Sequence, residues 1–352
     1  MSLATARYRV HVRRGAPGQD EAEHEVLAVS WRPGGTDGFD GAADDAHLVT
    51  FFRSACKPFQ ALPLVERGHA ERLGFGPKEL AVMSASHNGA AEHVTVVRGM
   101  LDRLGLSDKH LLCGFHYPED PDHDAALRKG ALAPSPLYNN CSGKHAGMLA
   151  LAVAEGWPVE DYVSFDHPVQ RACVAAVSEV CGVDARSVPL GVDGCSAANP
   201  AVPLSAMARG FSHFASARAD ASDARERALA RVRDAMIAHP VLVAGEGRFC
   251  TDVLAAGQGA VVTKTGAEGL QCLGFLASGE GVAIKVIDGS RRAVGPAAIA
   301  FLRDGGRLGA AALEALERWA HPALKNHRGL VVGELAAERE AAEPATVTAR
   351  GR

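Results

Sequence analysis

Alternating apolar and polar residues near the N-terminus predict β-strands. Residues Tyr8–Val12 alternate, Val26–Val29 is a short apolar run, and His47–Phe52 is a third strand-like segment. Short runs of this kind, rich in β-branched and aromatic residues, are typical of strands. The segment between the second and third runs, residues 33–45, is rich in Gly and Asp and is expected to be a loop.

The pattern becomes helical after Pro58. Apolar residues recur at helical spacing, and several segments open with Ser, Asp or Pro, which commonly begin helices. The predicted helices are residues 78–84, 92–104, 143–155, 168–180, 202–214 and 224–237. Strand patterns return after Cys250 at residues 259–263, 271–277 and 282–287, and helical patterns follow at residues 295–302 and 310–319.

Strands at both ends with helices between them indicate an α/β (α+β) fold. We expect an antiparallel sheet from both chain ends, flanked by helices, with a helical insertion. The sheet domain is predicted to comprise residues 1–57 and 246–337, and the mainly helical domain residues 58–245. Short glycine turns between the later strands favour antiparallel pairing. Residues 338–352 have little apolar surface to bury and are expected to be a disordered tail.

Composition excludes several classes of function. A hydrophobic content of 47% and a charged content of 22% are those of an ordinary globular protein. A net charge of -4 gives no basic surface for nucleic acid. We find neither an apolar signal segment nor an apolar stretch of membrane-spanning length. The 8 scattered cysteines therefore favour reduced thiols and a cytoplasmic location.

Three short motifs carry candidate chemistry. Ser54 and Lys57 form a Ser-x-x-Lys motif, in which a serine and an amine share one helix face. A serine hydroxyl needs such a base because it is a weak nucleophile at neutral pH. Ser86–Asn88 form a Ser-x-Asn motif, and Lys264–Gly266 form a Lys-Thr-Gly motif on a predicted edge strand. Serine β-lactamases and penicillin-binding proteins carry these elements in the same order.

Two cysteines precede or lie near predicted helices. Cys141 opens an apolar helix, and Cys195 lies in a loop with Asp193. The helix dipole stabilises a thiolate at a helix start, and two cysteines with a nearby lysine or histidine make a soft site suited to zinc. The chain has no Cys-x-x-Cys pair, so simple burial of two small side chains remains an alternative. His87 and His145 also lie within motifs and are candidates for proton transfer.

Five blocks of the sequence resemble the rhizobial-type (class 3) L-asparaginases, often called asparaginase II. The blocks are Arg53–Ala61, Ser86–Gly89, Asn140–Gly147, Asp193–Cys195 and Lys264–Gly269. The resemblance runs from about residue 8 to residue 330 in the same order. It implies a serine-β-lactamase-like fold that hydrolyses the side-chain amide of L-asparagine to aspartate and ammonia. Ala90 stands where we expect an acidic residue in many members.

The resemblance also implies roles for individual residues. Ser54 with Lys57, and Ser86 with Lys264, would form two Ser-Lys tandems that face one pocket. A zinc ion would be held by Cys141, Lys144 and Cys195. The predicted substrate-binding residues are Arg53, His87, Asn88, Asp193, Cys141 and His145, with L-asparagine as the partner. A homodimer is plausible for a chain of this size and family.

The resulting mechanistic hypothesis assigns the attack to Ser54. Neutral Lys57 would take the serine proton, and the charge of Lys264 would keep Lys57 neutral. Ser86 and Lys264 would then protonate the departing ammonia, while Arg53 and Asp193 would bind the charged groups of asparagine. Two alternatives stay open: a glutaminase or penicillin-recognising serine hydrolase on the same scaffold, and a non-catalytic zinc-binding or amino-acid-binding protein.

Overall fold

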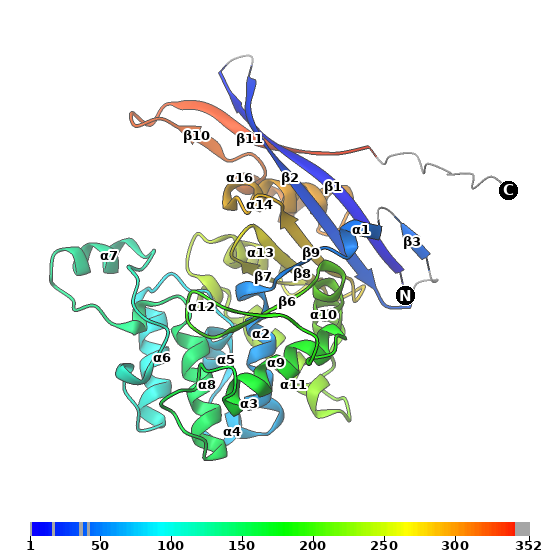
Figure 1. The fold of residues 1–352 in the computed structure, drawn as a ribbon. Helices are drawn as coiled ribbons and strands as arrows, with labels where there is room; N and C mark the ends of the chain where they lie inside the picture. The colour runs from blue at the N-terminus through cyan, green and yellow to red at the C-terminus, as the bar shows by residue number, and fades with distance from the viewer. Residues whose placement is uncertain (1, 16–17, 35–37, 41–42, 342–352) are drawn as a thin grey trace.

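One large sheet takes its strands from both ends of the chain, as the sequence predicts. The computed structural model describes residues 2–15, 18–34, 38–40 and 43–341 (Figure 1). Within them the strand order is β10-β11-β1-β2-β9-β8-β7, with antiparallel neighbours and β3 parallel to β1. The strands are β1 Ser2–Arg14, β2 Gln19–Arg32, β3 Gly38–Asp40, β7 Val261–Gly266, β8 Leu270–Phe275, β9 Gly281–Val286, β10 Ala323–Lys325 and β11 Val331–Arg339.

Helices cover both faces of this sheet because its central strands are apolar on both sides. In β2, Leu27 and Val29 join one buried cluster, whereas Val26 and Ala28 join the other. Successive side chains of a strand point to opposite faces, so β2 separates two cores. Helix α10 (Leu204–Ser216) contacts β8 and β9 within the first cluster, and α14 (Val294–Asp304) contacts the same strands within the second.

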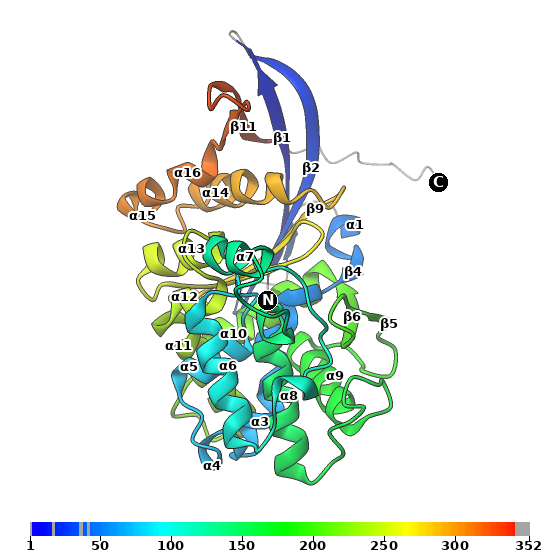
Figure 2. The same ribbon diagram turned by 90° about the vertical axis from the view of Figure 1, so that its left-hand side faces the viewer.

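The middle of the chain is mainly helical and packs beside the β7 end of the sheet (Figure 1, Figure 2). Its helices are α2 Lys57–Gln60, α3 Leu62–Glu66, α4 His69–Arg72, α5 Pro77–Met83, α6 Ala91–Arg103, α7 Pro121–Arg128, α8 Ser142–Glu155, α9 Pro168–Cys181, α10, α11 Ala224–Ala238, α12 Pro240–Ala244 and α13 Phe249–Gly257. Outside it are α1 Ala43–Ala46, α14, α15 Ala310–Ala315 and α16 Glu317–Ala320. Short 3-10 turns are η1 Arg53–Cys56, η2 Asp108–His110, η3 Pro136–Tyr138 and η4 Arg291–Ala293.

The strand that precedes Ser54 does not join the main sheet. Strand β4 (Val49–Phe51) pairs with β6 (Ala198–Pro203), which pairs with β5 (Leu190–Val192) in a separate small sheet. The helix expected from residue 202 therefore begins at Leu204, because the residues before it extend to pair with β4 and β5. This pairing brings the turn at Ser54 beside the β5–β6 connection that carries the Cys195 loop.

The C-terminal strand extends further than the sequence indicates. Residues 338 and 339, assigned to the expected tail, belong to β11 and pair with Arg9 and Tyr8 of β1. Glu338 also forms an ion pair with Arg13 at 2.5 Å, so charged residues pair here across the sheet. Residues 342–352 lie outside the described part of the chain. In that described part, no helix has the length and apolar character needed to cross a membrane.

Candidate active site

A cavity of about 360 Å³ lies where the edge strand β7 meets the helical part of the chain. Ser54 of η1, Ser86 of the loop after α5, and Lys264 of β7 all line it. The backbone N–H of Ser86 donates to the carbonyl of Val243 at 3.0 Å, which fixes the Ser86 loop against α12. The three motifs therefore meet at one cavity, although they are far apart in sequence.

Both buried lysines contact the same serine. Lys57 Nζ lies 3.0 Å from Ser86 Oγ and also donates to the carbonyl oxygens of Ala85 at 2.6 Å and Asn140 at 3.2 Å. Lys264 Nζ lies 2.8 Å from Ser86 Oγ and 2.9 Å from the carbonyl oxygen of Thr265. Ser86 Oγ is thus held between two amines.

The two amines have different surroundings. Burial lowers the pKa of Lys264 to about 7, and the nearby charge of Lys57 acts in the same direction. Lys57 faces three oxygen acceptors, which matches the three N–H donors of an ammonium group. A neutral Lys264 can accept the Ser86 O–H proton, whereas a protonated Lys57 can only donate to Ser86 Oγ.

Ser54 is placed differently from the sequence-based hypothesis. In the described residues its hydroxyl makes no hydrogen bond, and the expected contact with Lys57 is not formed. The Lys57 side chain is buried and turns toward Ala85 and Ser86 instead. Ser54 nevertheless lines the cavity, so both serines of the predicted pair are available to a ligand there.

The residue before Ser54 has an unusual backbone conformation. Arg53 has a φ of 49°, in the left-handed region that non-glycine residues rarely adopt. Its backbone N–H donates to Asn199 Oδ1 at 2.9 Å, and its Nε donates to Asp193 Oδ1 at 2.9 Å. The guanidinium therefore faces Asp193, and Arg53 lines a small internal space next to the cavity rather than the cavity itself. Such strain is common at functional sites.

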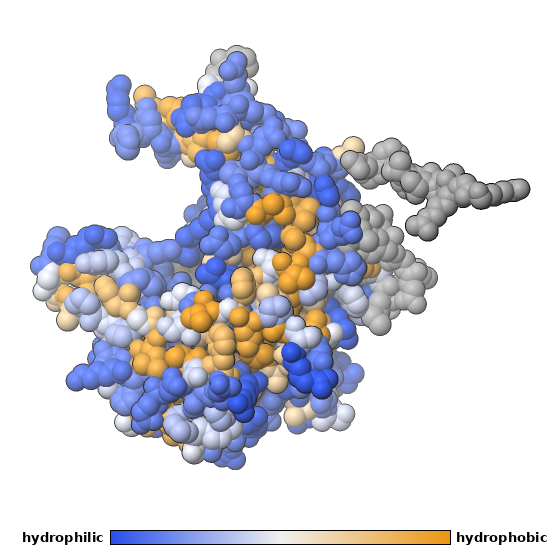
Figure 3. All heavy atoms as spheres, viewed as in Figure 1, coloured by the Kyte–Doolittle hydropathy of each residue, from blue (hydrophilic) through white to orange (hydrophobic). Residues whose placement is uncertain are grey.

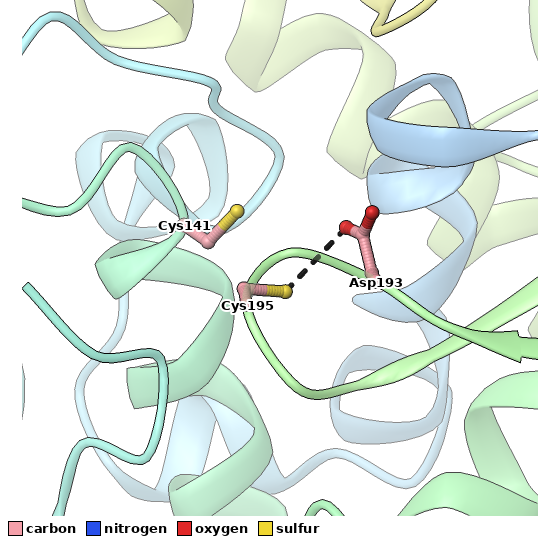
Figure 4. A group of neighbouring side chains, drawn as sticks. All are labelled: Cys141, Asp193 and Cys195. Atoms are coloured by element: carbon pink, nitrogen blue, oxygen red, sulfur yellow. Dashed lines mark hydrogen bonds between the residues drawn. The ribbon is translucent and has the colours of Figure 1, made fainter. Parts of the chain in front are cut away.

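A cluster of metal-ligand atoms adjoins this internal space (Figure 4). The ligand atoms of Cys141, Asp193 and Cys195 lie within 4.8 Å of one another, and Cys195 Sγ lies 3.5 Å from Asp193 Oδ2. Cys141 immediately precedes α8, whereas Cys195 and Asp193 come from the β5–β6 connection. Lys144, one turn into α8, places its Nζ 2.8 Å from Cys195 Sγ.

The charges of this cluster are coupled. A hydrogen bond from Cys141 lowers the pKa of Cys195, and it raises the pKa of Cys141 in return. Burial alone would lower the pKa of Lys144, but the adjacent Cys195 thiolate raises it above its usual value. Both shifts favour a charged pair of the Cys195 thiolate and the Lys144 ammonium group.

The donor set fits zinc. Two thiol sulfurs and one lysine amine converge in a buried cluster. Thiolates are usual ligands of tetrahedral zinc, and the amine of Lys144 would bind the ion only after losing its proton. Asp193 adds a carboxylate oxygen that the sequence analysis had assigned to substrate binding. The predicted ligands Cys141, Lys144 and Cys195 are thus brought together from two separate segments.

The two motif histidines are buried away from the cavity. His87 Nδ1 accepts a hydrogen bond from Gly89 N–H at 3.1 Å, and its Nε2 lies 2.9 Å from Ser142 Oγ. Burial lowers the pKa of His87 well below its usual value, so a neutral ring that fixes the loop is favoured. His145 Nδ1 lies 2.7 Å from the Tyr162 hydroxyl, and the ring is also buried. Neither residue lines the cavity.

Asn88 likewise supports the structure around Ser86. Its side-chain Oδ1 accepts from Ala90 N–H at 3.2 Å, and its carbonyl accepts from Asp120 N–H at 2.9 Å. The second contact attaches the loop before α7 to the Ser86 loop. Asn88 does not line the cavity. Ala90 joins the turn through its backbone N–H, which every residue except proline supplies.

A comparison with protein-family models places the chain in a known family. The model described as L-asparaginase II matches residues 10–337, nearly the whole chain. The chain belongs to the L-asparaginase II family. No curated protein matches it individually.

The cavity of this L-asparaginase II family member also contains residues that the sequence analysis did not select. Glu119, Arg248 and Cys250 line it together with Ser86 and Lys264. The Cys250 thiol accepts a hydrogen bond from Thr265 N–H at 3.2 Å, next to Lys264. None of these three residues lies in one of the sequence motifs, and tertiary packing brings their segments to the cavity.

Proposed function

We propose that this member of the L-asparaginase II family hydrolyses L-asparagine to L-aspartate and ammonia. One observation carries the proposal: Ser86 Oγ lies 2.8 Å from Lys264 Nζ, and burial lowers the pKa of that lysine to about 7. A serine next to a neutral amine is an activated nucleophile. Its position in a cavity of about 360 Å³ suits a small amino acid.

The reaction proceeds through an ester intermediate. The Ser86 O–H proton moves to Lys264 Nζ while Oγ bonds to the side-chain amide carbon of asparagine. Lys264 then gives that proton to the amide nitrogen, the C–N bond breaks, and ammonia leaves. A water molecule attacks the β-aspartyl ester with Lys264 again taking the proton, and Ser86 regains it as the ester bond breaks. Lys57 donates a hydrogen bond to Ser86 Oγ and so stabilises the negative charge that develops on this oxygen as its proton leaves.

This assignment moves the nucleophilic attack from Ser54, which the sequence-based hypothesis had chosen, to Ser86. Ser86 is favoured because both amines contact it, whereas Ser54 makes no hydrogen bond to either. Ser54 lines the same cavity and is the second candidate for the nucleophile. A catalytic hydrogen bond can tighten only when substrate binds, so an experiment must separate the two serines.

Covalent labelling makes that separation. The asparagine analogue 5-diazo-4-oxo-L-norvaline alkylates an activated serine hydroxyl, and Arg67, Arg72 and Lys78 place tryptic sites between Ser54 and Ser86. We expect the label on the peptide that contains Ser86, and its loss in Ser86→Ala but not in Ser54→Ala. A label confined to the Ser54 peptide would restore the original assignment.

Assays with different substrates test the proposed function itself. Ammonia release from L-asparagine by the purified protein is expected to exceed release from L-glutamine. Faster release from glutamine would make the protein a glutaminase, and rapid hydrolysis of nitrocefin would make it a penicillin-recognising serine hydrolase. Ligand binding without any turnover would indicate the non-catalytic zinc-binding or amino-acid-binding protein.

We further infer that Cys141, Lys144 and Cys195 hold a zinc ion beside the reaction cavity. When bound, zinc would supply a fixed positive centre that organises this part of the site. Soft thiolate ligands reduce Lewis acidity, and they leave few open positions for water activation. The proton transfers above therefore use Lys264 and Ser86 alone.

A homodimer and a serine-β-lactamase-like fold are further parts of the proposal. Hydrophobic residues gather across the middle of the face in Figure 3, and the small sheet exposes Val49, Phe51 and Val192. Exposed apolar patches of this kind often mark contact surfaces between proteins. Light scattering after gel filtration is expected to give twice the mass of 36.7 kDa, and a monomer would contradict the dimer.

A further inference from the structure

An arginine and a glutamate from different segments form an ion pair at the wall of the reaction cavity. Arg248 immediately precedes α13, and Glu119 lies in the loop before α7. Helix α7 and this loop are called the arm here, and α7 extends from the body of the molecule in Figure 1. Glu119 also contacts Arg291 Nη1 at 3.1 Å. Both partners of the Arg248–Glu119 pair line the cavity that holds Ser86 and Lys264.

The arm that carries Glu119 is fixed to the Ser86 loop. Asp120 N–H donates to the carbonyl of Asn88 at 2.9 Å, and His123 Nδ1 lies 2.7 Å from the carbonyl of Gly89. These contacts are only two and three residues from Ser86. The position of Glu119 relative to the nucleophile is therefore set by direct hydrogen bonds between the two loops.

A zwitterionic substrate needs one cation for its α-carboxylate and one anion for its α-ammonium group. Arg53 faces Asp193 in the neighbouring internal space, and Lys264 is engaged by Ser86. Arg291 lines the cavity but its side chain is 71% exposed, whereas that of Arg248 is only 22% exposed. A planar arginine fork binds a carboxylate through two hydrogen bonds, and partial burial strengthens them.

A comparison of side-chain exposure also selects the acidic residue for the α-ammonium group. Glu119 and Glu268 are the acidic residues in the described wall of the cavity. Glu268 is 69% exposed and lies 3.8 Å from Arg53, outside the Arg248 pair. Glu119 is less exposed, at 50%, and contacts Arg248 directly. A paired cation and anion match the two neighbouring charges of an α-amino acid.

We propose that Arg248 binds the α-carboxylate of the substrate and Glu119 binds its α-ammonium group. The proposal rests on the asparagine hydrolysis inferred above. In the absence of substrate the two side chains satisfy each other, and binding replaces their mutual contact with two substrate contacts. Burial lowers the pKa of Arg248 to about 10, which indicates a desolvated cation that gains from a carboxylate partner.

Two truncated substrates separate the contacts. Succinamate lacks the α-ammonium group of asparagine, and 3-aminopropanamide lacks the α-carboxylate. Arg248→Met should lower kcat/KM about 10²-fold for asparagine and succinamate, and leave 3-aminopropanamide within about 3-fold, because a lost charged hydrogen-bond pair affects only ligands that use it. Glu119→Gln should lower kcat/KM about 10-fold for asparagine and 3-aminopropanamide, and spare succinamate.

Controls distinguish recognition from folding. Arg303 of α14 forms an exposed ion pair with Glu317 of α16 at 2.8 Å. Arg303→Met removes this pair and should leave kcat/KM for all three substrates unchanged. Arg248→Lys keeps the charge and should recover part of the lost kcat/KM. An equal loss for all three substrates in Arg248→Met would overturn the proposal, as would faster asparagine turnover in Glu119→Gln.

Binding of L-aspartate, measured by calorimetry, keeps the inference separate from the proposed reaction. The wild-type protein should bind L-aspartate, and Arg248→Met should weaken that binding about 10²-fold. If the wild-type protein releases no ammonia, the proposed function fails while this binding difference still tests Arg248. If ammonia is released but Arg248→Met binds L-aspartate as tightly as wild type does, only the head-group proposal fails.

Discussion

Lys264 and Lys144 are buried to nearly the same extent but have opposite charge preferences. Their exposed fractions are 1% and 4%. Lys264 faces a neutral hydroxyl and lies near another ammonium group, so burial lowers its pKa to about 7. Lys144 lies 2.8 Å from the Cys195 sulfur, and the thiolate charge raises its pKa despite burial.

The comparison shows that the partner, rather than burial, decides what a buried lysine does. The Lys264 amine faces a hydroxyl and lies near the charge of Lys57, so its neutral form is favoured and it can act as a base. An amine beside a thiolate stays charged until a metal replaces its proton. Neighbouring regions of one protein thus provide a proton acceptor and a metal-binding cluster from the same type of side chain.

Removing the base should have the largest effect. Lys264→Met is expected to lower kcat for asparagine about 10³-fold, because it removes the group that takes the Ser86 proton. Lys264→Arg should be equally inactive, since arginine stays protonated in proteins. Steady-state ammonia assays test both variants. Substantial activity in Lys264→Arg would show that a neutral amine at this position is not required.

Removing a proposed sulfur ligand should weaken zinc binding by the cluster around Lys144. Cys195→Ser is expected to weaken zinc binding by more than about 10²-fold, a loss greater than that typical of residues that only support metal ligands. Competition with a chromophoric chelator and elemental analysis measure the change. Cys173→Ser, a buried cysteine on α9 outside the cluster, is the matched control. Equal zinc content in all three proteins would exclude the assigned ligands.

The pH profile sharpens the contrast between the lysines. Neutral Lys264 is the active form, so kcat should fall as pH drops below about 7, where the amine becomes protonated. Lys57→Met removes a charge that lowers the pKa of Lys264, so the acidic limb should move to higher pH by about one unit. An unchanged limb in Lys57→Met would show that Lys264 is not the titrating group.

The smallest effect concerns stability. Lys264→Met should raise Tm at pH 6 by several degrees, because burial of a charged amine is unfavourable. The unfolded chain binds more protons than the folded chain between the folded pKa of about 7 and the ordinary value of 10.5. The free energy of unfolding of the wild type therefore gains with pH in that window, and the stabilisation should shrink by pH 10. Calorimetry at both pH values tests the expected decrease.

Much of the fold follows from hydrophobic patterning. The strands β8 and β9 and helices such as α9 and α11 are predicted close to their observed bounds, because their periodicity is strong and local. The pairing of β4 with β6 is missed, since a three-residue strand does not reveal its partner. Strand β11 is missed because its outer residues are charged and its inward-facing residues are few.

Some residues of the candidate site are predictable from the sequence, and others are not. Motif order alone identifies Ser54, Lys57, Ser86 and Lys264. In the structure, Ser54, Ser86 and Lys264 line one cavity, and both lysines contact Ser86 Oγ. Glu119 and Arg248 are recognised only after folding, because no local pattern connects them. His87 and Asn88 lie within a motif, yet their hydrogen bonds hold the loop rather than face the cavity.

By itself, the sequence determined which reactive side chains this protein carries and the family to which they belong, because short motifs are written in consecutive residues. Only the tertiary structure decided that Lys57 and Lys264 both contact Ser86, that Arg53 faces Asp193, and that Arg248 pairs with Glu119. Spacing along a helix can place two residues on one face. The packing of other segments determines which atom a long, flexible lysine or arginine side chain reaches.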